Sequence, residues 1–197
     1  MADLEKTGKN LEGRGFRVHR FASGAEAAEF LVQTLHGTSI GIGGSVTVDT
    51  LGVYDRLCGS NEVLWHWKNH APETRERAGK AKTYLCSANG VSENGEIVNI
   101  DGFGNRVAGT IYGPERVFLV VGRNKIAPDL TGAIDRARNI AAPLNARRLN
   151  RHTPCAVGEP RCHDCRSPEK VCGVMTVFFM PPTSIKEFHV ILVDEDL

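Results

Sequence analysis

Hydrophobic residues recur along the chain with two different periods, and this pattern predicts strands that alternate with helices. Short apolar runs, typical of buried strands, are followed by stretches with apolar residues three and four positions apart, as in amphipathic helices. Strands are expected at 16–21, 38–42, 62–65, 83–87, 96–100, 116–121 and 188–193. Helices are expected at 3–13, 23–37, 46–57, 73–80, 105–112 and 131–142. Because a crossover between parallel strands needs a helix-length connection, this α/β order favours a mainly parallel sheet covered on both faces.

One segment departs from this alternation. Between Val91 and Ile100, the tripeptide Glu93-Asn94-Gly95 separates two short apolar runs, as at the tip of a β-hairpin. We therefore expect a local antiparallel excursion there.

The composition is that of an ordinary globular chain. With 197 residues, 41% hydrophobic and 24% charged, the chain is long enough for one well-cored domain over 1–197 and short for two. The formal net charge is +1, so the charge balance does not indicate a nucleic-acid partner. The first ten residues contain no apolar signal region, and no apolar stretch approaches the roughly 18 residues of a membrane span. We expect a cytoplasmic protein without a membrane partner.

Polar residues follow several predicted strands, at the end where parallel sheets commonly bind ligands. The first group is Gly43, Gly44, Ser45 and Thr47. Glycines let the backbone approach a ligand closely, and the two hydroxyls and the free N–H groups of a helix start can receive an anion. A tight strand-to-helix turn with a serine cap explains the same residues equally well.

A second group opens the helix expected at 105–112. Asp101, Gly104, Asn105 and Arg106 stand between that helix and the preceding strand. Asn105 is a candidate helix cap, and Arg106 is a candidate two-pronged donor to a carboxylate or phosphate, oriented by Asp101. The alternative is an internal ion pair between Asp101 and Arg106 that only stabilises the loop.

Three further candidates follow two other strands. Asn89 offers an amide hydrogen bond after 83–87, and Asn124 and Lys125 follow 116–121. A solvated loop explains Asn124 and Lys125 as well as a binding role does. The chain contains no Walker loop, nucleophile elbow or His-Glu-x-x-His motif, so no catalytic residue is assigned.

Four cysteines near the C-terminal end have the most specific spacing in the chain. Cys155, Cys162, Cys165 and Cys172 form the pattern C-x6-C-x2-C-x6-C within a polar segment, 150–175. A C-x-x-C turn lets two thiolates converge on one ion, and two more thiolates complete the set that zinc or an iron–sulfur cluster requires. Zinc, an iron–sulfur cluster, and disulfides or free thiols stay open as alternatives.

The remaining cysteines and a run of arginines suggest no further site. Cys58 and Cys86 are interpreted as buried structural thiols, because free cysteine behaves mainly as a small hydrophobe. The arginines are interpreted as a solvated helix face, since the chain lacks both net charge and interleaved aromatic residues. These are Arg136, Arg138, Arg147, Arg148 and Arg151.

Taken together, these motifs resemble a LUD-domain protein over nearly the whole chain. The matching motifs are Gly41–Thr47, Ser87–Asn89, Asn99–Gly102, Gly104–Val107, Val121–Lys125 and the cysteine segment ending in Val190–Val193. The resemblance implies a Rossmann-like sheet of the sugar-phosphate isomerase and CoA transferase type, with a small cysteine-rich C-terminal segment. It also implies an association with bacterial lactate oxidation, redox protein partners and a homodimer.

Two functions stay open on this basis. The first is a redox-associated accessory protein or enzyme of lactate and small organic-acid utilisation, with a crevice for an anionic metabolite, a carboxylate or phosphate, and a four-cysteine metal site. The alternative is a non-catalytic metabolite-binding or scaffold module with structural zinc.

Overall fold

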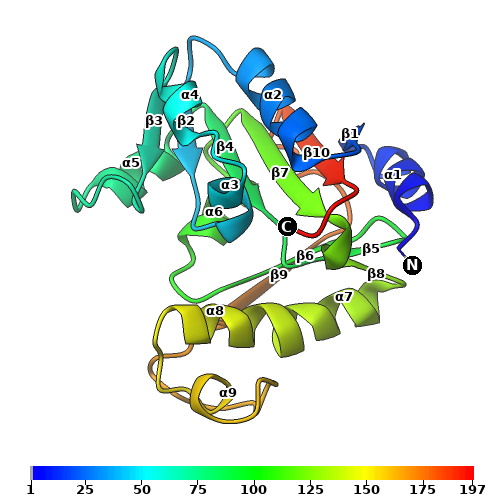
Figure 1. Cartoon of the computed structure of the whole chain (residues 1–197), viewed down its shortest axis with the longest axis vertical. Helices are drawn as coiled ribbons and strands as arrows, with labels where there is room; N and C mark the ends of the chain where they lie inside the picture. Colours follow the sequence, from blue (N-terminus) through cyan, green and yellow to red (C-terminus); the bar gives the residue numbers. More distant parts are fainter. Residues whose placement is uncertain (1) are drawn as a thin grey trace.

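The computed structural model describes residues 2–197 and contains a large parallel sheet and a smaller mixed sheet (Figure 1). The large sheet is formed by β1 (Arg17–Phe21), β2 (Ser39–Ile42), β3 (Glu62–Trp65), β4 (Thr83–Ser87), β7 (Arg116–Gly122) and β10 (Glu187–Val193). Its strand order is β1-β10-β7-β4-β2-β3, and every neighbouring pair is parallel. The predicted α/β class with a mainly parallel, Rossmann-like sheet is confirmed.

Helices connect the strands of the two sheets. They are α1 (Leu4–Gly13), α2 (Gly24–Thr34), α3 (Val46–Thr50), α4 (Tyr54–Cys58), α5 (Thr74–Gly79), α6 (Asn105–Ile111), α7 (Leu130–Arg136), α8 (Ala142–Arg148) and α9 (Pro154–Val157), with a 3₁₀ turn at Arg123–Lys125. Ser23 caps α2 by accepting the N–H of Glu26, as its position predicts. None of the helices in residues 2–197 is long and apolar enough to cross a membrane.

The central strand β7 shows how both faces of the large sheet are buried. Val117, Leu119 and Val121 pack with α1 and the smaller sheet, whereas Phe118 and Val120 pack with α2, α3 and α4. Successive side chains of a strand point to opposite faces, so a strand covered on both sides must be apolar at nearly every position. This continuous apolar run is the pattern that predicts strand β7 from the sequence.

The smaller sheet contains the predicted hairpin and two strands that the sequence did not predict. Its order is β8 (Ile126–Ala127), β5 (Gly90–Ser92), β6 (Ile97–Asp101) and β9 (Val174–Phe178). Strands β5 and β6 are antiparallel, and Gly95 between them has a φ of +90°. Helix α7 packs closely on β5, because a Cβ atom at Gly90 would lie 2.5 Å from the carbonyl oxygen of Ala133.

Three local expectations were wrong. The helix expected at 46–57 is broken at Gly52, whose φ of +63° separates α3 from α4. The helix expected at 131–142 is longer, because α7 continues through a π-helical turn, Ala137–Ala141, into α8. Cys58 is exposed at the end of α4, although Cys86 in β4 is buried as expected.

Candidate functional site

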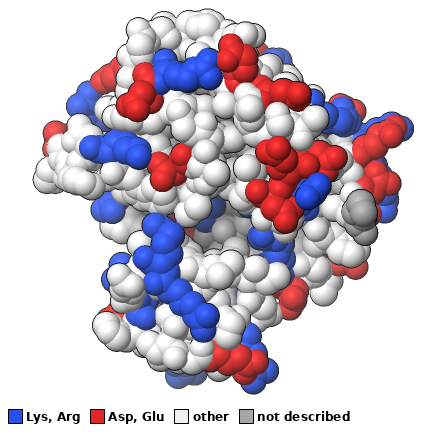
Figure 2. Space-filling view, viewed as in Figure 1, with Lys and Arg blue, Asp and Glu red and all other residues white. Residues whose placement is uncertain are grey.

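A cleft of about 760 Å³ opens between the large sheet and the helical segment from α7 to α8. Figure 2 shows the hollow, with Lys and Arg side chains beside it. Its wall includes Ser45 after β2, Ser87 at the end of β4, and Lys125 after β7. The cleft therefore lies at the carboxyl ends of neighbouring parallel strands, where sheets of this kind bind ligands, and its volume suits a small molecule.

Most of the sequence-predicted site residues line this one cleft. Nine of the eleven do so, namely Gly44, Ser45, Thr47, Asn89, Asp101, Asn105, Arg106, Asn124 and Lys125. Gly43 lies behind the wall, since a Cβ atom there would be 3.0 Å from Cγ of Arg106. Gly104 is the N-cap of α6, with a left-handed φ of 93°. The fold thus gathers loops that are far apart in the sequence.

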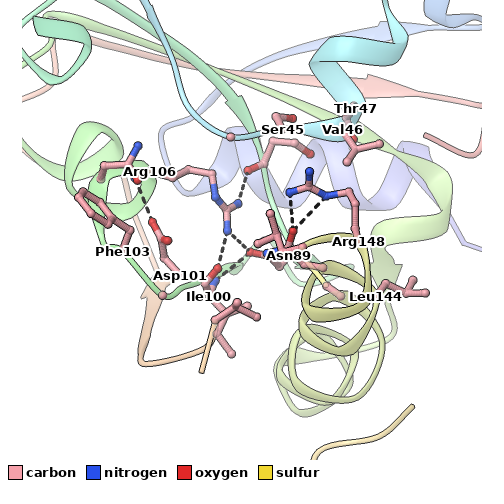
Figure 3. Close-up of a pocket in the computed structure, with 18 of the residues that line it drawn as sticks. Ser45, Val46, Thr47, Asn89, Ile100, Asp101, Phe103, Arg106, Leu144 and Arg148 are labelled. Carbon is pink, nitrogen blue, oxygen red and sulfur yellow. Dashed lines mark hydrogen bonds between the residues drawn. The ribbon is translucent and has the colours of Figure 1, made fainter. Parts of the chain in front are cut away.

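Arg106 belongs to the cleft wall, but its guanidinium group is occupied by the protein. Nη1 donates to the carbonyl of Ser87 at 3.1 Å and to Oδ1 of Asn99 at 3.0 Å. Nη2 donates to Oδ1 of Asn89 at 2.7 Å and to the carbonyl of Ile100 (Figure 3). Four of the five N–H groups of Arg106 therefore donate to other residues of the protein. The guanidinium group has no pair of donors left for the expected two-pronged contact with a ligand.

Asp101 has a different role from the one expected. Its carboxylate accepts the backbone N–H groups of Arg106 at 3.0 Å and Val107 at 3.2 Å, so it stabilises the first turn of α6. It forms no ion pair with the Arg106 side chain in the described structure, and the N-cap of α6 is Gly104 and not Asn105. The expected ion pair between Asp101 and Arg106 is wrong, because Asp101 accepts backbone N–H groups of α6 and Arg106 donates to two backbone carbonyls and to the amide oxygens of Asn89 and Asn99.

Lys125 is the buried lysine of the cleft, with 8% of its surface exposed. Its Nζ donates to Oγ of Ser87 at 2.7 Å and to the hydroxyl of Thr47. Burial, together with the positive charges of Arg136 and Arg106, lowers the pKa of Lys125 to about 7. Asn124, by contrast, exchanges hydrogen bonds with the backbone of Leu197 and offers less to a ligand.

Sequence patterns missed the arginines that α7 and α8 contribute. Arg136 and Arg148 both line the cleft, although they were assigned to a solvated face. Nε of Arg136 donates to the carbonyl of Asn124 at 2.7 Å, and burial lowers its pKa. The guanidinium of Arg148 lies 4.6 Å from the centre of a Trp67 ring and reaches into the same space (Figure 3).

The π-helical turn explains why these two arginines share a face. In an uninterrupted α-helix, residues 136 and 148 would point about 120° apart, because each residue advances about 100°. The turn at Ala137–Ala141 takes up one extra residue and brings them nearly into line. No simple sequence signal marks such a turn.

His66 adds a titratable group to the cleft wall. Its Nδ1 is buried and has no hydrogen-bond partner within residues 2–197. Burial and the nearby Arg75 lower the pKa of His66, and Asp101 opposes that shift. His66 was not among the sequence-predicted residues.

A LUD domain family model matches residues 4–193. The chain belongs to the LUD domain family. This family is associated with lactate utilisation. The crystal structure of a DUF162 family protein from Deinococcus radiodurans has a similar fold, with a TM-score of 0.54, 15% identity, and coverage of 96% of this chain and 95% of that chain. At this identity the likeness concerns the fold alone, and no curated protein matches the chain.

The four cysteines of this LUD domain lie near one another. All are free thiols and half-buried. Burial raises the pKa of Cys172, and the charges of Cys162, Cys165 and Cys155 add to that shift. Within residues 2–197, however, no group of three or more His, Cys, Asp or Glu side chains is arranged to hold a metal ion. Metal binding by the four cysteines therefore stays a prediction.

The cysteine segment of the LUD domain is tied to the α7–α8 helix by polar contacts. The backbone N–H of Cys162 donates to Oδ1 of Asn139 at 2.8 Å. Arg138 donates to Sγ of Cys162 at 3.3 Å and forms an ion pair with Asp164 at 3.2 Å. Arg147 donates to the carbonyls of the α9 turn. These hydrogen bonds help to hold the cysteine segment in place, because the segment buries few apolar side chains.

Proposed function

We propose that this LUD domain binds a small anionic metabolite, a carboxylate or phosphate, in the cleft, and that it serves lactate or small organic-acid utilisation. The observation that supports this is the charge of the lining. Its positive side chains are Arg75, Arg106, Arg136, Arg148, Arg151 and Lys170, and Lys125 adds an amine to the same lining. Its acidic side chains are Asp101 and Glu169, and both accept N–H groups of the backbone. A concave site lined by one sign of charge concentrates ligands of the opposite sign.

Two arginines keep donors for such a ligand. Arg136 uses Nε and Nη1 on the backbone carbonyls of Asn124 and Asn89, which leaves Nη2 without a partner in residues 2–197. Arg148 uses Nε and Nη2 on Oδ1 of Asn145, so its Nη1 has no hydrogen-bond partner in the part of the chain that the structure describes. Guanidinium groups bind carboxylate and phosphate oxygens with charge-assisted hydrogen bonds, the strongest kind available to a side chain.

Calorimetric titration with phosphate, lactate and pyruvate tests the proposal. Arg148→Gln should weaken the binding of the anion by roughly 10- to 150-fold, because a hydrogen bond to a charged group contributes about 1.5 to 3 kcal/mol. The neighbouring Arg147 is a matched control on the same helix, since its guanidinium contacts the carbonyls of Ala156 and Gly158 outside the cleft. Arg147→Gln should leave the affinity unchanged. Equal affinities in both variants, or no binding of any anion, would contradict the proposal.

A second proposal concerns the metal. Cys155, Cys162, Cys165 and Cys172 suit a zinc ion or an iron–sulfur cluster in their number and in the softness of their sulfur atoms. Sγ of Cys162 already accepts two N–H groups, from Arg138 at 3.3 Å and from the backbone of Asp164 at 3.4 Å, as the ligands of a metal commonly do in their surroundings. Zinc would order the segment, whereas a cluster would supply one-electron transfer.

Anaerobic purification, elemental analysis and a visible spectrum separate these functions. Colourless protein with one zinc per chain favours the scaffold module, and brown protein with iron and sulfide favours a redox role. Cys162→Ser should abolish metal binding, and Cys86→Ser, which changes a buried thiol of β4, should not. Metal-free protein with four titratable thiols would exclude the site.

A further inference from the structure

Lys125 differs from the other lysines of this chain in its environment. It is buried, and no carboxylate within residues 2–197 forms an ion pair with it. The lysines that do form ion pairs are Lys6, Lys9, Lys68, Lys80 and Lys186. A lysine is seldom buried unless it is paired, because removing an unpaired ammonium group from water is costly. The amine is therefore better suited to the neutral form.

Two hydroxyl groups hold the amine in place. Nζ lies 2.7 Å from Oγ of Ser87, at the end of β4, and within hydrogen-bond distance of Thr47 in α3. Ser87 donates its own hydrogen to the carbonyl of Ala88 at 3.3 Å, so its oxygen accepts from the lysine. A neutral amine that donates both hydrogens to these hydroxyls keeps its lone pair for another partner.

The charges around Nζ favour the same state. Arg136 and Arg106 act on Lys125, and their positive charges add to the effect of burial in lowering its pKa to about 7. A substantial fraction of the amine is then neutral at neutral pH. A desolvated lysine beside another cationic group is a recognised form of activated amine nucleophile.

We propose that Lys125 forms an imine with a small aldehyde or ketone that carries an anionic group, an inference that rests on the proposed anion-binding function. Nζ attacks the carbonyl carbon, and the carbonyl oxygen takes up a proton to give a carbinolamine. The carbon–oxygen bond then breaks, and the oxygen leaves as water with two hydrogens that balance those lost from the amine. The free donors of Arg136 and Arg148 would hold the anionic group. No oxidant or reductant is required.

Borohydride trapping on the full chain tests this step. The protein is incubated with pyruvate or with glycolaldehyde phosphate, reduced with sodium borohydride, and examined by intact mass and peptide mapping. We expect one reduced adduct per chain, on the peptide that contains Lys125, with a trapping rate that rises through a pH of about 7. The two carbonyl compounds distinguish a carboxylate from a phosphate as the anionic group.

Two variants test whether Lys125 is the residue that forms the adduct. Lys125→Arg keeps a positive charge but cannot form an imine, so it should give no adduct. Lys186→Met removes an exposed lysine that pairs with Glu115, and its adduct should match that of the wild type. Adduct spread evenly over surface lysines, or none with either compound, would overturn the proposal. Phosphate binding without any adduct would overturn the imine alone, whereas loss of both would overturn the anion site as well.

Discussion

At the scale of single residues, Lys125 makes stability depend on pH. Its folded pKa of about 7 lies below the ordinary lysine value of 10.5, so between these values the unfolded chain binds the proton more tightly. The free energy of unfolding therefore rises with pH between these two values. Below a pH of about 7 the buried amine is protonated in the folded state, and the full destabilisation from burying its charge is present. Low pH should destabilise the native state through this one amine.

Lys125→Met should therefore raise the free energy of unfolding at pH 6, by roughly 1 to 3 kcal/mol after the loss of the bonds to Ser87 and Thr47. This increase in the free energy of unfolding should become smaller as the pH rises to 9. Urea denaturation of both proteins at several pH values measures it. If the difference in the free energy of unfolding between the two proteins stayed constant from pH 6 to 9, the pKa of the buried Lys125 amine would not be lowered.

At the scale of elements, one guanidinium group joins the ends of β4 and β6 to α6. Arg106 gives hydrogen bonds to Ser87, Asn89, Asn99 and Ile100, and each of these acceptors loses one donor if the side chain is shortened. Oδ1 of Asn89 still accepts the backbone N–H of Ile100. Buried acceptors without donors are costly. The site therefore needs Arg106 for its shape.

Arg106→Met should lower the free energy of unfolding by about 2 to 4 kcal/mol. Arg106→Lys should not restore it, because an ammonium group lacks the planar fork. Arg75→Met, which removes a contact with the Phe103 ring at 4.8 Å, should cost less than about 1 kcal/mol. Chemical denaturation compares the three, and similar losses for Arg106→Met and Arg75→Met would refute the structural role.

At the scale of the whole molecule, the cysteine segment is set apart from the hydrophobic cores. The two clusters on the faces of the large sheet contain no residue of 150–175. Cys172 and Met175 only border the third cluster, under α7. Loss of a metal should therefore loosen this segment without unfolding the sheet.

Hydrogen exchange of Cys162→Ser against the wild type measures this separation. Faster exchange is expected within 150–175, and unchanged exchange is expected in β7 and β10, where the backbone is paired on both sides. The segment's bonds to Arg138 and Asn139 should keep it near α8. Exchange that rises equally in β7 would mean that the segment and the sheet unfold together.

The sequence by itself determined the parallel sheet and the loops that line the cleft. Continuous apolar runs such as β7 are a local property of the sequence, and the carboxyl ends of neighbouring parallel strands lie at the same edge of a sheet. The sequence therefore predicts that Ser45, Asn89 and Lys125 lie together, and all three line the cleft. Strands β8 and β9 were missed, because one has two residues and the other is mostly half-exposed.

Only the tertiary structure decided which donors are free for a ligand. The guanidinium of Arg106 is occupied by acceptors from β4, β6 and the loop after β4, and the carboxylate of Asp101 is occupied by α6. Lys125 is buried and forms no ion pair with a carboxylate of residues 2–197, and a π-helical turn aligns Arg136 with Arg148. The spacing of hydrophobic residues is set by neighbours in the sequence. The hydrogen-bond partners and the burial of a polar group, by contrast, depend on residues far away in the chain.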